Sequence, residues 1–375
     1  MRLRAALLAA AHLVLPVTLS VNFLSCRFDS LDLLATNIFL LSGMAGVSSK
    51  ALLFVLDRER FELLLLRLQR TRMRFPDNSG ARERRRRMAT RVYYAQHGSA
   101  QLVVLLWVSV PGVTALVSGE GRELPMPLCP PATAADVHLS PCFELIYALQ
   151  AACLFVAVEG MISLDSSYLT LMLNIATELE VLNDNLVSIR SGRLPEDKKC
   201  SQLSDQSPSN PAHEDDMYFQ LVENIKHHQH IISRAQELES VMSGPTFVHL
   251  FYSLVCISLS IVSVTVLLQT EGYTPKILKI TFVIVVFVSQ LGFFCILGNN
   301  VIEQSERLLV SAYSSYWPGA QPRFQRALLV LMLRARHPLH ISVAKLYPLS
   351  KETYLQILNA SYTLFNLVFQ TNGRN

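Results

Sequence analysis

Charged residues are scarce in this chain. Asp, Glu, Lys and Arg make up 17% of its 375 residues, whereas hydrophobic residues make up 51%. Soluble domains carry roughly 25% charged residues. The scarcity argues against an ordinary soluble domain and predicts a protein with several membrane-spanning segments.

The usual motifs of catalysis and metal binding are also missing. The sequence has no GxSxG, HExxH, GxxxxGKS/T or GxGxxG pattern, and its seven cysteines include no CxxC pair. We therefore expect neither an enzyme nor a metal or cofactor site.

We interpret the run His227, His228 and His230 as solvated helix residues. A disulfide between Cys129 and Cys142, which fall in one polar connection, stays an open alternative.

Long apolar runs predict an all-α membrane protein with seven transmembrane helices in a single domain, residues 1–375. The first run follows Arg2 and Arg4 and could also be a signal peptide, but its length favours a span. Lys50 lies near one end of the second run, where we expect its side chain to reach the membrane surface. The predicted spans are residues 5–24, 31–56, 92–117, 142–175, 246–268, 278–301 and 351–371, and a cytoplasmic helical anchor is predicted from 176–245 and 304–349.

The distribution of basic residues predicts the orientation. Residues 57–91 hold twelve arginines, and a cytoplasmic amino terminus puts 26 Lys and Arg on the inner face against 4 on the outer. We therefore predict an extracellular carboxyl terminus, which is the reverse of a G-protein-coupled receptor. The run Arg84–Arg87 is interpreted as a topology signal that contacts lipid, not nucleic acid. Residues 191–216 are polar and contain proline, and we expect them to be disordered.

The last predicted span carries a stripe of polar side chains. Gln356, Asn359, Thr363, Asn366 and Gln370 recur at steps of three or four residues, which places them on one face of a helix. Amides in hydrocarbon cost free energy unless they find partners. The stripe therefore either bonds to neighbouring helices or lines water.

The carboxyl-terminal part of the chain also resembles a known family. The resemblance is carried by the order and spacing of Ser305, Leu308, Tyr313, Trp317, Arg334, Pro338, Leu339, Leu349, Ser350, Tyr354, Ile357, Ser361 and Tyr362, and by residues 224–239 before the fifth span. With the inverted topology, these residues make the chain similar to the insect odorant receptors over nearly its whole length. In gustatory receptors, the nearest relatives, the last span has TY, then five apolar residues, then QF. Here Ala360 and Ser361 follow Thr353 and Tyr354 at that spacing, which favours the odorant branch.

The resemblance implies a function. It implies an odorant-binding tuning subunit that joins the olfactory coreceptor in a heterotetrameric, ligand-gated, nonselective cation channel. The expected location is the plasma membrane of olfactory neuron dendrites, and the expected partners are the coreceptor, a volatile odorant and membrane lipid. The alternatives are a gustatory-type channel and a metabotropic seven-helix receptor. Family members carry some tens of residues before the first span, so we expect the amino terminus here to be truncated.

The resemblance also implies roles for individual residues. Four copies of the last span would line a pore with an apolar gate, and the ligand pocket would lie between spans two, three, four and six. The residues implied for the pore and gate are Thr363, Leu367, Gln370 and Thr371. Those implied for the ligand pocket are Asn37, Leu40, Trp107, Pro111, Tyr147, Ala151, Phe155, Phe282 and Val286. Those implied for the structural anchor are Ser305, Tyr313, Trp317, Arg334 and Pro338.

Overall fold

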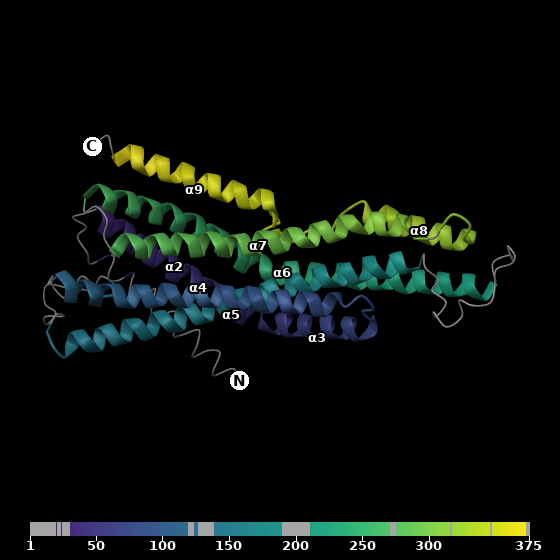
Figure 1. The fold of residues 1–375 in the computed structure, drawn as a ribbon, viewed down its shortest axis with the longest axis horizontal. Coiled ribbons are helices and arrows are strands. Elements are labelled where there is room, and N and C mark those ends of the chain that lie inside the picture. Colours follow the sequence, from purple (N-terminus) through teal and green to yellow (C-terminus); the bar gives the residue numbers. More distant parts are fainter. Residues whose placement is uncertain are drawn as a thin grey trace.

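The computed structural model is an elongated bundle of long helices (Figure 1). It describes residues 20, 24, 31–118, 124–126, 139–189, 211–270, 275–315, 317–345 and 347–372. The expected first span, 5–24, lies outside these residues except for Ser20 and Leu24, and so do Cys129 and residues 191–210. Cys142, at the start of a helix, is a free and exposed cysteine.

The elements follow one another as helices with one small exception. They are α2 (Leu31–Leu56), α3 (Arg58–Arg74), α4 (Ala81–Ser118), α5 (Cys142–Ser188), α6 (Pro211–Thr270), α7 (Pro275–Tyr313), α8 (Pro322–Ala335), β1 (Ser342–Val343), β2 (Tyr347–Pro348) and α9 (Lys351–Asn372). The expected all-α class is therefore right apart from β1 and β2, an antiparallel pair of two-residue strands that pairs Val343 with Tyr347 just before α9.

Five of the described helices, namely α2, α4, α5, α6 and α7, are long and apolar enough to cross a membrane. At about 1.5 Å per residue, the 47 residues of α5 extend about 70 Å and the 60 residues of α6 about 90 Å. A hydrocarbon core is only about 30 Å thick. These helices therefore continue well beyond a bilayer, toward the end of the molecule that carries α3 and α8, here called the α8 end (Figure 1).

Several expected boundaries need correction. α2 has the predicted bounds, and α5 continues to Ser188 into the predicted helical anchor, but α4 begins at Ala81, within what was expected to be a soluble connection. α6 is continuous from Pro211 through Pro245, so residues 211–216 are helical and the prediction of disorder there is wrong. For α4 the reason is a contact with another helix, because Arg82 in its first turn donates to the buried Glu178 of α5, which a local apolar pattern does not reveal. In α6, the exposed Asp215 accepts a hydrogen bond from Arg323 of α8.

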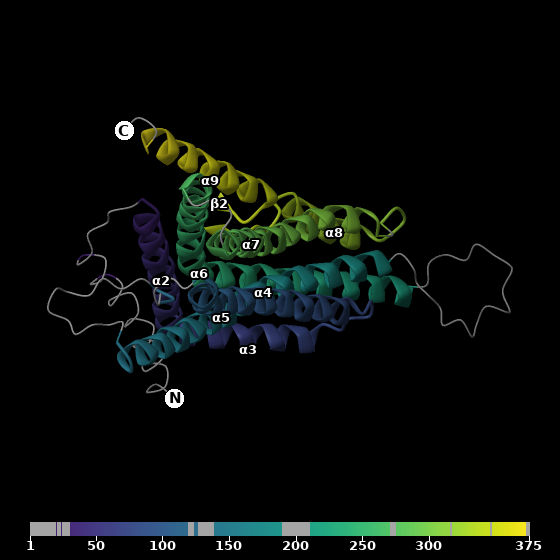
Figure 2. The ribbon, with the colours of Figure 1, turned by 60° about the vertical axis from the view of Figure 1, so that its left-hand side comes forward.

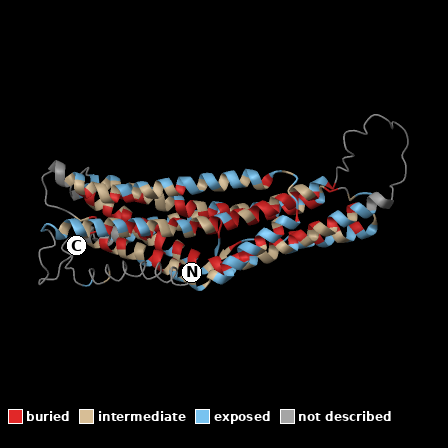
Figure 3. Ribbon diagram, turned by 90° about the horizontal axis from the view of Figure 1, so that it is seen from below, coloured by how far each residue is buried: buried red, intermediate tan, exposed pale blue. Residues whose placement is uncertain are grey.

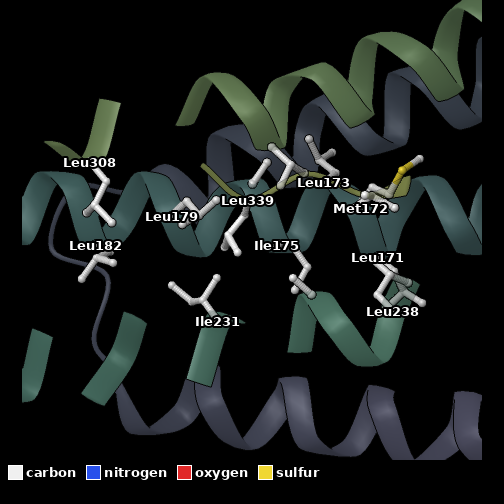
Figure 4. Close-up of a cluster of buried hydrophobic side chains, with 14 of the residues drawn as sticks. Leu171, Met172, Leu173, Ile175, Leu179, Leu182, Ile231, Leu238, Leu308 and Leu339 are labelled. Carbon is white, nitrogen blue, oxygen red and sulfur yellow. The ribbon is translucent and has the colours of Figure 1, made fainter. Parts of the chain in front are cut away.

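The largest apolar core lies toward the α8 end. There Leu179, Leu182 and Leu186 of α5 are fully buried, together with Leu238 of α6 and Leu308 of α7. Figure 4 shows side chains from these three helices converging on one another. Fully burying one such leucine contributes about 1.5–3 kcal/mol. Figure 3 shows that buried residues follow the interfaces between the long helices and that their outward faces are exposed.

A buried carboxylate joins four helices in this core. Glu178 of α5 is fully buried and accepts a hydrogen bond of 2.6 Å from Arg82 of α4, with Arg72 of α3 at 3.3 Å. His227 of α6 lies 3.2 Å from the same carboxylate. Because His227 and its neighbour His228 are buried, the interpretation of the histidine run as solvated is wrong. The described residues contain no group of His, Cys, Asp and Glu suited to a metal ion.

α9 leaves the bundle at an angle and lies against α6 and α7 (Figure 2). The β1–β2 pair leads into it, and the Leu349 N–H donates to the Ile341 carbonyl at 2.9 Å. Gly298 of α7 allows this approach, because a Cβ at that position would collide with the Cβ and carbonyl oxygen of Leu349. The start of α9 therefore packs directly against α7.

Candidate functional site

An apolar cavity of about 110 Å³ lies between five helices in the half of the molecule away from the α8 end. It is lined by Phe39 and Leu40 of α2, Trp107 of α4, Tyr252 of α6 and Phe287 of α7, among others. The Phe39 ring stacks on Trp107 with centroids 5.7 Å apart and meets Phe287 edge-on at 6.2 Å. A cavity with such a lining suits a small apolar ligand.

The polar atoms of the lining aromatic residues already have partners. The indole Nε1 of Trp107 donates to the Pro125 carbonyl at 2.9 Å, and the Tyr252 hydroxyl lies 2.8 Å from Nδ1 of His249. Tyr252 can approach α2 because Gly46 has no side chain, since a methyl group there would collide with the tyrosine ring. These rings therefore present mainly carbon to the cavity.

A second cavity, of about 100 Å³, adjoins the first between α4, α5 and α7. Val103, Val158, Met161 and Phe287 line both cavities. The second cavity differs in also having three buried polar side chains in its lining, Gln96, Asp165 and Gln290. The pair of cavities therefore combines an apolar chamber with a partly polar one.

A buried charge pair borders the polar chamber. Lys50 of α2 donates to one carboxylate oxygen of Asp165 on α5, and Gln290 of α7 donates to the other. His249 of α6 lies 3.2 Å from the lysine Nζ. Lys50 is only 1% exposed, so the expectation that it reaches the membrane surface is wrong. It is held instead by Asp165 of α5 and His249 of α6.

The residues expected at a ligand pocket are spread over a wider region than the cavities. Leu40 and Trp107 line the apolar chamber, and Val286 lines the polar one. The remaining six line neither of these two cavities: Asn37 and Pro111 are buried, Tyr147, Ala151 and Phe282 are half-buried, and Phe155 is 49% exposed.

Residues missed by the sequence analysis include Tyr252, Gln96 and Gln290. Tyr252 belongs to α6, which was not expected to contribute to a pocket. Its spacing of three from His249 in an apolar helix was a usable signal, because two polar aromatic side chains on one helical face seldom face lipid.

α9 has two contrasting faces. Thr353 and Ser361 are buried on the packed face, where the Ser258 hydroxyl of α6 donates to the Ser361 carbonyl at 3.2 Å. The polar stripe lies on the opposite side of the helix: Gln356, Asn359, Thr363 and Gln370 are exposed and Asn366 is half-buried. Leu367, the expected gate residue, is 61% exposed. Thr371 lies in α9, and its side chain is outside the described part.

The residues expected in the anchor lie around α7 and α8. The Ser305 hydroxyl oxygen is buried and accepts a hydrogen bond from the Leu339 N–H at 2.8 Å. Arg334 donates to the His337 carbonyl at 2.9 Å, and Pro338 is half-buried. Trp317 packs against the largest apolar core. The ring centroid of Tyr313 lies 5.9 Å from that of Trp317, and Tyr313 is 61% exposed.

Comparison with known proteins adds an independent line of evidence. A family model described as 7tm Odorant receptor matches residues 30–362. Odorant receptor 10 of Aedes albopictus is 27% identical over 235 residues, which cover 62% of this chain and 57% of that protein. Odorant receptor Or2 of Anopheles gambiae is 25% identical over 280 residues, which cover 73% of this chain and 69% of that protein. The match thus spans less than two thirds of the Aedes relative.

The fold is similar to that of a solved receptor. The olfactory receptor OR5 of Machilis hrabei, in complex with eugenol, superposes with a TM-score of 0.78 at 15% identity, covering 98% of this chain and 88% of that one. A second structure of the same receptor superposes with a TM-score of 0.77. At this identity, the likeness concerns the fold alone.

Proposed function

Because this chain belongs to the 7tm odorant receptor family of insects, we propose that it is an odorant-binding tuning subunit of a ligand-gated, nonselective cation channel. In this proposal it forms a heterotetramer with the olfactory coreceptor in the plasma membrane of olfactory neuron dendrites. Its ligand is a small volatile odorant. The membership in the family rests on the match over residues 30–362.

The proposed topology has seven spans, with the amino terminus in the cytoplasm and the carboxyl terminus outside. It is made of the five apolar helices, the segment 5–24 and α9. The arginines of α3 and of the first turns of α4 lie at the α8 end, which supports a cytoplasmic position for that end. The helices that extend beyond the bilayer then build the cytoplasmic anchor.

The observation that carries the channel proposal is the exposed polar stripe of α9. Within one chain the packed face of α9 lies against α6 and α7, and no helix among the described residues covers the exposed part of the stripe. Amide side chains facing lipid cost free energy. If four such helices face one another around an axis, the stripes border water, which accounts for their position.

The ligand is proposed to bind in the two adjoining cavities. Their lining is mostly apolar with a few polar groups, which suits a small volatile molecule. The solved receptor with the similar fold was determined in complex with eugenol.

Patch-clamp recording tests this function. The chain is expressed with an insect olfactory coreceptor, and excised patches are exposed to an odorant panel without nucleotides. We expect odorant-evoked cation currents that the coreceptor alone does not give. A current that requires GTP, or silence to a broad panel despite confirmed surface expression, would contradict the proposal.

A further inference from the structure

The polar chamber contains buried hydrogen-bonding atoms that have no partner in the protein. Both amide atoms of Gln96 and the amide oxygen Oε1 of Gln290 are buried without a hydrogen-bond partner. The side chains of Gln96 and Gln290 are 7% and 6% exposed, respectively. Both residues line the second cavity. Buried amide atoms normally have partners, so these atoms point to a bound group that supplies them.

The polar atoms share one end of the cavity. Gln96 precedes Val103 by two turns on α4, Asp165 follows Met161 by one turn on α5, and Gln290 follows Phe287 by one turn on α7. α4 runs away from the α8 end whereas α5 and α7 run toward it (Figure 1). Each polar residue therefore lies on the α8 side of an apolar one, and the cavity has an apolar side and a polar end.

The donor and acceptor inventory selects the ligand group. Asp165 is already occupied by Lys50 and Gln290. What remains is one NH₂ donor on Gln96 and two carbonyl acceptors, one on each glutamine. A hydroxyl group donates one hydrogen bond and accepts others, so it can bond to a glutamine carbonyl and to the Gln96 NH₂ at once.

Other groups fit this site less well. A ketone, ester or ether only accepts, which leaves both glutamine carbonyls without a donor. A carboxylate would be repelled by these carbonyl oxygens and by the carboxylate of Asp165. An ammonium group would be repelled by the charge of Lys50, which already neutralises Asp165.

We propose that the chamber lined by Gln96 and Gln290 is a hydroxyl-recognition subsite, which makes this receptor selective for small apolar alcohols or phenols. This inference rests on the proposed function and specifies its ligand class. The hydroxyl would lie between the two glutamines, and the apolar body would extend past Val103 and Phe287 into the apolar chamber. The specificity follows because an apolar compound leaves the amides unpaired.

One competing occupant is water. A cavity of about 10 Å³ borders Gln96 and Ser166, and the Ser166 hydroxyl is also without a partner in the protein. That space is about the size of one water molecule. Such a water satisfies one amide atom of Gln96 and leaves the other for the ligand, whereas waters throughout the chamber would leave no preference for a hydroxyl.

Matched odorants and one pair of variants test the proposal. Cells expressing the chain with the coreceptor are exposed to saturated and aromatic alcohols and to their methyl ethers. We expect the alcohols to activate at about tenfold lower concentrations than the ethers, the effect of one good hydrogen bond. Gln96→Met keeps the shape of the side chain and removes its polar atoms. We expect it to reduce the difference by raising the half-maximal concentration of the alcohols alone, because only the carbonyl of Gln290 is then left to bind the hydroxyl.

Gln101→Met is the matched control, because Gln101 lies on the same helix, is bonded to Glu159 and lines neither cavity. It should keep the preference for alcohols. Equal sensitivity of the wild type to alcohols and ethers, or a preference that is undiminished in Gln96→Met at normal surface expression, would overturn the subsite. Absence of any odorant-evoked current would instead contradict the channel function and, with it, this inference.

Discussion

A lysine and an aspartate are buried against each other among the apolar helices. Lys50 and Asp165 are each 1% exposed at the side chain. The lysine Nζ also lies 5.7 Å from the centre of the Tyr252 ring and 5.8 Å from that of Phe294. A buried pair contributes little net stability compared with apolar residues, but the loss of one partner leaves an uncompensated charge. The pair therefore fixes how α2 and α5 meet.

Removing one charge should harm folding more than removing both. Lys50→Met leaves Asp165 buried and unpaired, and we expect it to destabilise the fold by about 3–5 kcal/mol. The double variant Lys50→Met, Asp165→Met should recover most of that loss. Thermal unfolding of purified protein in detergent measures both. Lys351→Met is the control, because Lys351 and its partner Glu303 are exposed. Equal losses for single and double variants would contradict the role of the pair.

The proposed gate also depends on a single residue, Leu367. Leu367 is exposed beside the polar stripe, and apolar side chains that meet in a pore exclude water when it is closed. We expect Leu367→Ala to raise the current in the absence of odorant. Leu355→Ala, another exposed leucine of α9, should leave that current at the wild-type level. An unchanged basal current in Leu367→Ala patches would exclude this residue from the gate.

At the scale of elements, a glycine controls the position of α9. Gly298 of α7 touches Leu349, and Gly298→Ala must push the start of α9 away. We expect this variant to shift the odorant dose–response curve or lower surface expression, even though the residue lies outside both cavities. Gly98→Ala on α4, where nothing lies within 4 Å of an added Cβ, should resemble the wild type. Similar curves for the two variants would argue against coupling through this contact.

The start of α4 depends on a single carboxylate. Asp77 accepts hydrogen bonds from the N–H groups of Arg82 at 2.8 Å and Ala81 at 3.3 Å, and from the Ser79 hydroxyl at 3.0 Å. Burial alone would raise the pKa of Asp77, but these hydrogen bonds outweigh it and hold the pKa below its ordinary value. The stabilisation is therefore complete above the ordinary carboxyl pKa and is lost as the pH falls through the lowered one.

We expect Asp77→Ala to destabilise the protein by about 1 kcal/mol at neutral pH, as for loss of a helix cap. The difference from the wild type should shrink in acid, as the pH passes through the lowered pKa. Thermal unfolding across a pH series measures this, with the exposed neighbour Asn78 changed to Ala as the control. A difference that persists unchanged in acid would mean that the carboxylate is not the source of the stabilisation.

The sequence predicts some elements well and others poorly, for a physical reason. α2 and α9 coincide with strong changes in composition, so their limits were predictable. The extensions of α5 and α6 toward the α8 end fall largely within the predicted helical anchor. The helical start of α4 was not predicted, because contacts such as Arg82 with Glu178 join residues far apart in sequence. The same holds at the site, where Lys50 of α2 meets Asp165 of α5 and His249 of α6.

At the scale of the whole molecule, a polar face of α9 is exposed among the described residues of one subunit. The cavities and the largest core are built within the chain, whereas most of the stripe on α9 lies outside the helix packing that the structure describes. In the proposed channel, several such subunits would satisfy the stripe with water along a central axis. We therefore propose that this face borders the ion pathway.

Cysteine accessibility tests that claim most directly. Thr363→Cys places a thiol on the exposed stripe, and Leu364→Cys places one on the neighbouring half-buried position. Each variant is recorded with the coreceptor while a cationic thiol reagent is applied during odorant exposure, and the unmodified chain gives the background from its own cysteines. The account predicts rapid loss of current for Thr363→Cys and little change for Leu364→Cys. Equal rates, or no modification at Thr363→Cys in an open channel, would contradict it.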